Sequence, residues 1–378
     1  MNRSFGPFCR VLLLLLAAAL FPAGAEAHAA ASSAGRAEDT AAQEIAEEEP
    51  DVKRIVLGHV GDSYEWHIAT AGGREWSLPL PVIVHSPSSG WHCFSAKRLR
   101  GGAEYEGLRI AADGDHAGKI VERQADGSDL RPLDLSITKT VAGLLLNSAL
   151  VVALVLGAAR WYRGRKPDAA APRGVVGLFE TLVESLVDDL IEPCVGPSYR
   201  RFAPYLLTVF CFIFLNNLMG LIPFFPGGAN VTGNIAVALV LAVATFLVVN
   251  LSGSRHYWKD IFWPDVPTWL KVPVPIIPLI ELVGVFTKPF ALMIRLFANM
   301  LAGHAVILSL TCVVFVTVKM GAAVNASMTA LSVLFSIFMN CLELLVAFLQ
   351  AYVFTMLSAV FIGLAQERGG EADAGAEK

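Results

Sequence analysis

Charged residues are scarce in this chain and missing from long parts of it. Only 16% of the 378 residues are charged, whereas a soluble globular domain has about a quarter. No charged residue lies between Arg201 and Arg255, and only Arg295, Lys319 and Glu343 interrupt the stretch from Lys288 to Glu367. The mean hydropathy of +0.56 also excludes an ordinary soluble domain. Because a membrane span needs about 20 apolar residues, we predict an all-α polytopic membrane protein with about five membrane-embedded helices.

Other features that the sequence lacks exclude several classes of function. Runs of Lys and Arg interleaved with aromatic residues are absent, which gives no sign of a nucleic-acid partner. A phosphate-binding loop is also absent, so we expect no direct nucleotide binding and no cofactor. His85, His92 and His116 are irregularly spaced and lack neighbouring ligands, which favours surface histidines over a metal site. Any nucleotide chemistry must therefore belong to partner subunits.

The first residues have the pattern of a secretory signal peptide. Arg3 and Arg10 precede the apolar run Val11–Phe21, and Ala25-Glu26-Ala27 offers small residues for cleavage. We predict a signal peptide over residues 1–27, with an uncleaved anchor as the alternative. In both cases the segment that follows lies outside the cytoplasm.

Residues 28–137 form the predicted exported extension. The stretch to about Pro50 is rich in alanine and acidic residues and has no apolar periodicity, so we expect disorder. Short alternating runs follow, such as Val52–Val60 and Trp76–Val84, and they predict a small β-rich segment. Only Cys93 lies in this extension beyond the signal, which leaves no internal disulfide.

The predicted membrane domain covers residues 138–366. Its first span, Val141–Ala159, is followed at once by basic residues, which places that end in the cytoplasm. Within residues 174–192, apolar residues recur at helical spacing, and Glu180, Glu184 and Asp188 form an acidic stripe on another face. We predict an amphipathic helix on the cytoplasmic membrane surface, in contact with protein because its polar face is acidic.

Two further spans, Ala203–Phe225 and Val231–Leu251, are joined by the turn 226–230, which predicts a membrane hairpin. The charged and aromatic segment Arg255–Lys271 fits a cytoplasmic interface, and a proline-rich entry with Pro278 follows it. A polar tail, residues 367–378, ends the chain, and we expect it in the cytoplasm.

The last two apolar stretches are longer than a bilayer requires. Phe290–Lys319 would reach about 45 Å as a helix and Asn325–Ala365 about 60 Å, against a hydrocarbon core of about 30 Å. Ordinary spans tilt by only about 20°. We therefore expect these helices either to break or to be strongly tilted around a partner.

Arg295 is the exceptional residue of these stretches. A central arginine costs at least roughly 3 kcal/mol to insert into a membrane, and its guanidinium does not deprotonate in proteins. It can therefore attract a carboxylate, lower the pKa of that group and repel cations. A structural ion pair with Glu343 is the alternative interpretation.

Other polar groups surround this position in the sequence. Asn299 follows Arg295 by four residues and shares its helix face, whereas His304 follows by nine and faces the opposite side. In the last stretch, Asn340, Glu343 and Gln350 are the polar groups, and the latter two share one face. Intramembrane ionisable groups point by default to an ion or proton pathway. The alternatives are a packing role for His304 and an interhelical contact for Gln350.

Three motifs stand out in the membrane domain. The most specific runs from Lys288 to His304, with the sequence KPFALMIRLFANMLAGH. The others are LQAYVF from Leu349 to Phe354, and FLNNLMGLIP from Phe214 to Pro223 with Asn230-Val231-Thr232. Together they resemble the a subunit of F-type ATP synthase, here of a bacterial type with a signal peptide and an extended exported N-terminus. The resemblance covers roughly residues 138–366.

The resemblance implies roles for individual residues. Arg295 would be the essential arginine facing a ring of c subunits, with Asn299 and Gln350 as polar neighbours. His304 and Glu343 would line a half-channel open to the exported side, with Asn340 close by in the sequence. The acid and the histidine stand on exchanged helices compared with some family members, and Gly228 and Ala229 replace an acidic residue of the hairpin. Lys288 and Glu281, seven residues apart, are the candidates for the cytoplasmic exit.

The predicted function is a proton-translocating stator channel whose two half-channels load and unload c-ring carboxylates and so drive ATP synthesis. The expected partners are the c-ring, b-type peripheral stalk subunits, the lipid bilayer and protons. The expected location is the bacterial inner membrane, with a periplasmic mature N-terminus and a cytoplasmic C-terminus. A secondary transporter is the alternative, although the chain shows none of the internal repeats such proteins usually have. A scaffold would leave Arg295 and His304 unexplained.

Overall fold

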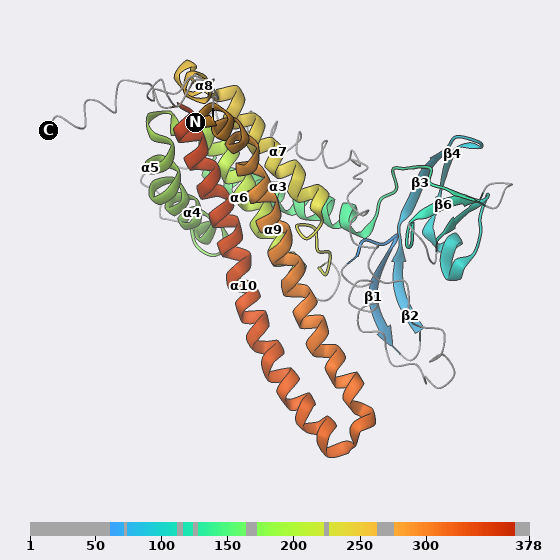
Figure 1. Cartoon of the computed structure of the whole chain (residues 1–378). Coiled ribbons are helices and arrows are strands. Elements are labelled where there is room, and N and C mark those ends of the chain that lie inside the picture. The colour runs from blue at the N-terminus through green and yellow to red at the C-terminus, as the bar shows by residue number, and fades with distance from the viewer. Residues whose placement is uncertain are drawn as a thin grey trace, which may run out of the picture.

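The computed structural model describes residues 61–71, 74–111, 116–123, 128–163, 172–222, 227–262 and 276–366. Figure 1 shows a small β domain beside a bundle of long helices. Several predicted segments lie outside the described residues: the signal peptide over 1–27, the acidic segment over 28–50, the strand over 52–60 and the tail over 367–378.

The β domain contains three small antiparallel sheets among its described residues. Two strands, β1 (Glu65–Ala71) and β2 (Arg74–Pro79), form the first sheet. The second has the order β4-β3-β8 and the third β5-β6-β7. Their bounds are β3 Pro81–Ser86, β4 Gly90–Ser95, β5 Leu108–Ile110, β6 Ile120–Arg123, β7 Asp129–Leu130 and β8 Leu133–Asp134, with the short helix η1 (Ala96–Gly102) after β4.

The alternation of apolar residues explains how these strands form a core. Val82 and Val84 on β3 are fully buried, as are Leu108 on β5 and Val121 on β6. The prediction of a β-rich segment is confirmed. The single strand predicted over 76–84 is wrong in detail, because β2 ends at Pro79 and a separate strand begins at Pro81.

The rest of the described chain is helical. The helices are α3 (Lys139–Tyr162), α4 (Val175–Ser185), α5 (Glu192–Val195), α6 (Tyr199–Leu221), α7 (Ile235–Ser252), α8 (Arg255–Phe262), α9 (Ile276–Thr317) and α10 (Ala322–Gln366). Short helices η2 (Leu186–Ile191), η3 (Gly196–Ser198) and η5 (Val318–Met320) connect some of them. Five helical segments among the described residues are long and apolar enough to cross a membrane. This confirms the predicted fold class.

Helix α7 begins later than the sequence pattern suggests. The predicted span began at Val231, but the chain turns through residues 231–234 before the helix starts. Asn234 caps it, because its Oδ1 accepts a hydrogen bond of 3.0 Å from the backbone N–H of Ala236.

The predicted amphipathic helix over 174–192 is divided. Helix α4 continues into one turn of π-helix, η2, and then into α5. Leu186, Leu190 and Ile191 are buried, but Leu178 is 75% exposed and does not belong to the buried face. The extra residue of a π turn rotates the helix face, so α4 and α5 cannot share a single apolar stripe.

The last two helices are unbroken and very long. With 42 and 45 residues, they reach about 63 Å and 68 Å at 1.5 Å per residue. Helix α9 includes Pro289 and also Pro278, which was predicted to belong to a proline-rich entry. Pro278 lies in the first turn, where proline removes no helical hydrogen bond. The alternative that these two helices break is therefore wrong. Upright, each helix would be longer than the bilayer core of about 30 Å, so both must tilt to fit within it.

Helix α10 is held against the bundle by close backbone approach and by buried amides. A Cβ atom at Gly363 would lie 2.0 Å from the carbonyl oxygen of Cys194, so only glycine allows α10 to pack on α5. Asn217 donates a hydrogen bond of 3.2 Å to the carbonyl of Ala347 and accepts one of 2.6 Å from Thr232. Such polar contacts are expected between membrane helices.

The β domain is fixed to the helices. Trp66 on β1 is only 3% exposed and packs in the same apolar core as α3, α6 and α7. Its indole Nε1 donates a hydrogen bond of 3.3 Å to the carbonyl of Gly227 in the α6–α7 connection. The backbone N–H of Lys139, the first residue of α3, donates one of 2.8 Å to the carbonyl of Ser63.

Candidate functional site

The centre of the site is a pair between α9 and α10. Nδ1 of His304 lies 2.7 Å from Oε1 of Glu343. The Glu343 side chain is 4% exposed and that of His304 is 16% exposed. Neither carboxylate oxygen accepts a hydrogen bond from a described residue, so the contact with His304 is an ion-pair contact rather than a well-aligned hydrogen bond. A buried carboxylate with this single partner is well suited to accept a proton.

Two glycines make room for this pair. A Cβ atom at Gly303 would lie 2.9 Å from Oε1 of Glu343 and 3.1 Å from its Cδ, so the carboxylate rests directly on the backbone of α9. A Cβ atom at Gly220 on α6 would lie 3.6 Å from Nε2 of His304. The imidazole therefore has one nitrogen toward Glu343 and the other toward α6.

The pair faces a cavity of about 430 Å³. This volume holds on the order of ten water molecules. Residues from α9, α10, α6, the α6–α7 connection, α3 and β1 line it: Trp66, Lys139, Gly220, Leu221, Gly227, Gly228, Asn230, His304, Ile307, Leu308, Thr311, Ser336, Asn340 and Glu343. The cavity thus joins an intramembrane acid and histidine to the side of the molecule that carries the β domain.

Arg295 and Asn299 lie elsewhere on α9, as the helical spacing predicts. Both are exposed, and Arg295 forms no hydrogen bond or ion pair with any residue that the structure describes. Arg295 and Glu343 therefore do not form the ion pair that was the alternative interpretation. The reason is that the buried Glu343 is directed to His304, on the other side of α9.

The remaining predicted residues of α10 divide between two environments. Gln350 is 8% exposed and shares the buried face with Glu343, as predicted. Asn340 lines the cavity but is otherwise exposed, and its Nδ2 donates a hydrogen bond of 2.8 Å to the carbonyl of Ser336. The structure thus brings Asn340, Glu343 and His304 together and leaves Gln350 about two turns from Glu343 along α10.

Lys288 and Glu281 lie near α8, at the opposite end of the bundle from the β domain. Nζ of Lys288 lies 5.6 Å above the ring of Phe361 and borders a cavity of about 20 Å³ beside Tyr257. Burial and, secondarily, the carboxylate of Glu281 raise the pKa of Tyr257. Both predicted residues therefore lie close to Tyr257, although they form no ion pair with each other.

Sequence reasoning missed several residues of the site. Gly303 gave no signal beyond its place in the motif, because its importance depends on a neighbour 40 residues away. Trp66 lies between the two predicted strands and Lys139 just before the first predicted span, and only the docking of β1 and α3 brings them to the cavity. Thr311 and Ser336 are polar residues in apolar stretches, which is a weak sequence signal for a polar cavity.

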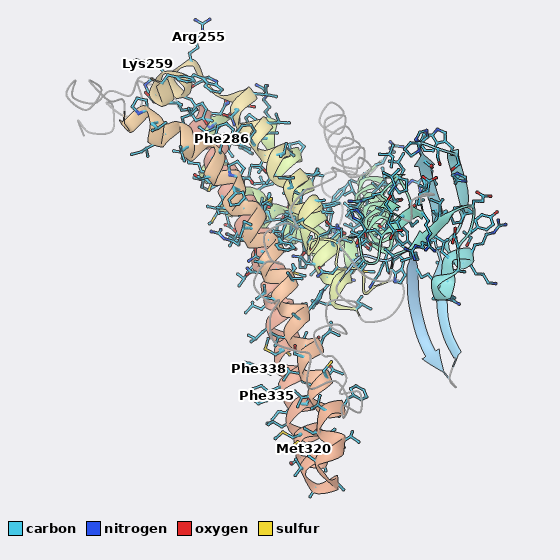
Figure 2. The ribbon with its side chains drawn as sticks, turned by 45° about the vertical axis from the view of Figure 1, so that its right-hand side comes forward. Arg255, Lys259, Phe286, Met320, Phe335 and Phe338 are labelled. Carbon is cyan, nitrogen blue, oxygen red and sulfur yellow. The ribbon has the colours of Figure 1, made fainter. Side chains whose placement is uncertain are left out.

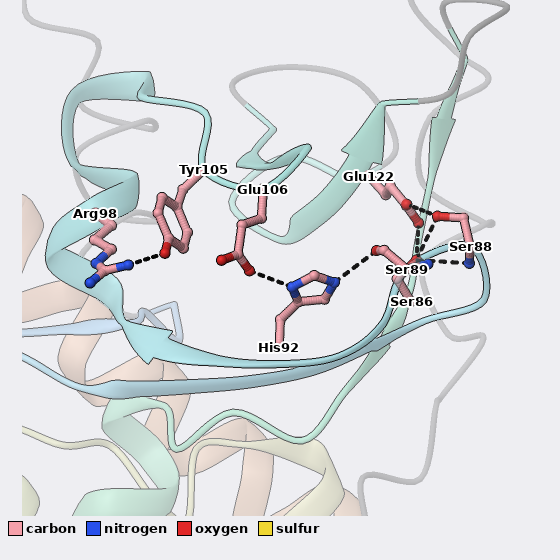
Figure 3. Close-up of polar contacts among 8 residues, drawn as sticks. All are labelled: Ser86, Ser88, Ser89, His92, Arg98, Tyr105, Glu106 and Glu122. Atoms are coloured by element: carbon pink, nitrogen blue, oxygen red, sulfur yellow. Dashed lines mark hydrogen bonds and ion pairs between the residues drawn. The ribbon is translucent and has the colours of Figure 1, made fainter.

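The β domain has its own polar cluster, shown in Figure 3. The ring of His92 lies between Ser89 Oγ at 2.7 Å and Glu106 Oε2 at 2.5 Å. This hydrogen bond lowers the pKa of Glu106. The described residues contain no group of His, Cys, Asp and Glu that could hold a metal ion.

The hydroxyls of Ser86 and Ser88 both donate to Glu122 and lower the pKa of its carboxyl group. Each serine hydroxyl in the cluster already has a hydrogen-bonding partner, and the cavities of the helical part do not reach it. We interpret the cluster as a stabilising network of the domain.

Comparisons with known proteins agree with the geometry. Residues 145–363 match the family described as ATP synthase A chain, and residues 55–135 match a domain of unknown function (DUF8433). The chain is 47% identical to ATP synthase subunit a 2 of Chlorobaculum tepidum over 61% of this chain and 64% of that protein. It is 45% identical to ATP synthase subunit a of Chlorobium phaeobacteroides strain DSM 266, over 64% and 68%. The match to ATP synthase subunit a of Anaeromyxobacter dehalogenans has 34% identity over 83% of this chain and 80% of that protein.

Proposed function

This chain belongs to the ATP synthase A chain family, and on that basis we propose that it is the proton-translocating stator subunit of a bacterial ATP synthase, with His304, Glu343 and Arg295 at the centre of the path. The observation that carries the proposal is the cavity that leads from the β-domain side to the buried His304–Glu343 pair. It ends within the membrane-spanning part, as a half-channel requires.

The exposed position of Arg295 supports a contact with a second protein that moves past it. Arg295 lies on the surface of α9 among exposed apolar residues such as Ile294 and Phe290. Only 17% of the most apolar stretch of α9, and likewise of α10, is buried within the chain, against 67% for the segment through α6. An arginine exposed to lipid is costly, so this face fits a ring of c subunits whose carboxylates pair with Arg295 in turn.

Figure 2 shows labelled side chains at the two ends of the helical part. Phe335, Phe338 and Met320 project from the far half of the α9–α10 hairpin, whereas Arg255 and Lys259 lie at the α8 end. Phe335 is 48% exposed and Phe338 is 56% exposed. Basic residues accumulate on cytoplasmic ends of membrane helices. We therefore propose that α8 and the C-terminus are cytoplasmic and that the β domain is periplasmic, in the inner membrane.

The path follows from these positions. A proton enters the cavity through water, passes His304 and Glu343, and neutralises a carboxylate of the ring. A neutral carboxyl group can enter lipid, whereas a charged one is strongly disfavoured. After rotation, Arg295 favours the ionised carboxylate, and the proton leaves near Asn299, Gln350, Lys288 and Glu281 toward the α8 end. Each charge crossing the membrane releases about 2.3 kcal/mol per 100 mV, which biases the direction of rotation.

A static partner must hold this subunit against the turning ring. Val175 is 68% exposed and Leu178 is 75% exposed on α4, beside an apolar groove that Ala153, Gly157 and Phe179 line. Small residues allow close helix packing in membranes. We propose that a membrane helix of a b-type peripheral stalk subunit occupies this groove.

The central test replaces Arg295 by alanine and measures ATP-driven acidification of inverted membrane vesicles. We expect acidification to be lost while the complex still assembles, because the variant removes the cation that favours the ionised ring carboxylate. The matched control is Arg255→Ala, which removes the same charge from an exposed position on α8 and should pump normally. Normal pumping by the Arg295 variant would contradict the proposed function.

A further inference from the structure

The cavity of the proposed half-channel is not built by membrane helices alone. Trp66 comes from the β domain and Lys139 from its junction with α3, yet both line the same space as His304 and Glu343. The proton path described above uses the inner residues and assigns nothing to these two. Their presence connects the exported domain directly to the site.

The outer wall is rigidly held. Besides the bond from Lys139 to Ser63, the backbone N–H of Thr140 donates a hydrogen bond of 3.0 Å to Oδ1 of Asp62. On the other side, α3 approaches the α6–α7 connection so closely that a Cβ atom at Gly143 would lie 2.6 Å from that of Ala229. Lys139 and Trp66 are therefore fixed parts of the cavity wall rather than features of a loosely attached domain.

The charges around the cavity are few. Among its lining residues Lys139 is the one lysine or arginine, Glu343 the one acid and His304 the one histidine. Lys139 is half-buried and interacts electrostatically with the carboxylate of Asp62, although the two groups form no direct ion pair. Glu343 is 4% exposed, and its Oε2 has no hydrogen-bonding partner in the described chain. A carboxylate of this kind attracts any cation that enters.

The positive charge of Lys139 in the wall of the same cavity repels every such cation. A proton forms a covalent O–H bond with the carboxylate, so it can bind in spite of this repulsion. A hydrated alkali ion is held only by electrostatic attraction and coordination, so the same repulsion leaves it with little occupancy.

We propose that the exported β domain forms the outer wall of the half-channel, and that Lys139 is a selectivity residue that keeps alkali cations such as Na⁺ from occupying Glu343. The inference rests on the proposed function, because it assumes that protons reach Glu343 through this cavity. It assigns a role to the domain that no family description supplies.

The test uses the purified, complete synthase in proteoliposomes. ATP synthesis is driven by an acid-to-base jump, with either sodium chloride or choline chloride at equal ionic strength on the side that faces the β domain. The variants are Lys139→Gln, which removes the charge, and Lys139→Arg, which keeps it. Lys97→Gln is the matched control, since Lys97 is exposed on η1 and does not line the cavity.

We expect the ratio of the rates in sodium and in choline to stay near one for the unaltered chain, Lys139→Arg and Lys97→Gln. It should fall several-fold for Lys139→Gln. A purely structural role for Lys139 would lower both rates together and leave the ratio unchanged, which would overturn the proposal. An equal fall in the Lys97 control would also overturn it.

The rate of ATP synthesis by Glu343→Gln in choline chloride distinguishes a failure of this inference from a failure of the proposed function. If Glu343→Gln is inactive while Lys139→Gln shows no sensitivity to sodium, only the selectivity role of Lys139 fails. If Glu343→Gln synthesises ATP at the unaltered rate, the proposed path itself fails.

Discussion

Gly303→Ala offers the sharpest test of the His304–Glu343 pair, because it adds a single methyl group at the point where the carboxylate touches α9. The added Cβ atom would lie 2.9 Å from Oε1 and 3.1 Å from Cδ of Glu343, whereas ordinary contacts begin at 3.4 Å. The carboxylate must therefore move by about 0.5 Å, the difference between 3.4 and 2.9 Å. Since its Oε1 lies 2.7 Å from His304, such a movement lengthens or breaks the pair.

The expected effect is a loss of proton transfer without a loss of the helix. A misplacement of about 1 Å in a reacting group can cost about 100-fold in rate, so we expect a shift of half that size to slow pumping about tenfold. Alanine favours a helix over glycine by about 1 kcal/mol, so weaker folding of α9 cannot explain the loss. The measurement is the initial rate of ATP-driven acidification in inverted vesicles, normalised to the amount of assembled complex.

Gly284→Ala is the matched control on the same helix, because an added Cβ atom there has no neighbour within 4 Å. It should pump at the unaltered rate. Equal rates for the two alanine variants would refute the reasoning, since they would show that the position of the Glu343 carboxylate on α9 does not matter for transfer.

Two further predictions concern stability. Gly363→Ala places a Cβ atom 2.0 Å from the backbone carbonyl oxygen of Cys194, and overpacking of this kind costs about 1–3 kcal/mol of stability. We therefore expect less assembled complex after mild heating. The control Gly157→Ala, whose added Cβ atom has no neighbour within 4 Å, should match the unaltered chain. Glu122 has a pKa below its ordinary 4.5 because Ser86 and Ser88 donate to it, so it stabilises the folded β domain above pH 4.5 and that stability is lost as the pH falls through the lowered value. The protection of the amides of strands β3 and β6 against exchange, relative to their intrinsic rate at each pH, should therefore fall on acidification of the intact complex. The fall should be smaller in Glu122→Gln, and an equal response in both would contradict this assignment.

The sequence alone determined the class of the protein and the main polar residues of its site. Charge-free stretches of bilayer length specify membrane helices, because lipid excludes unpaired charge and unsatisfied backbone groups. The same rule made Arg295, His304 and Glu343 conspicuous, and helical spacing separated the face of Arg295 and Asn299 from that of His304. Each of these conclusions depends only on neighbours along one helix.

The tertiary structure decided everything that depends on two segments meeting. Only the packing of α9 on α10 shows that Glu343 lies against His304 and Gly303 rather than beside Arg295. Only the docking of β1 and α3 on the α6–α7 connection brings Trp66 and Lys139 into the cavity. Periodicity predicts which face of a helix is buried, but not which residue of another segment covers it, because that choice depends on the shapes of both surfaces.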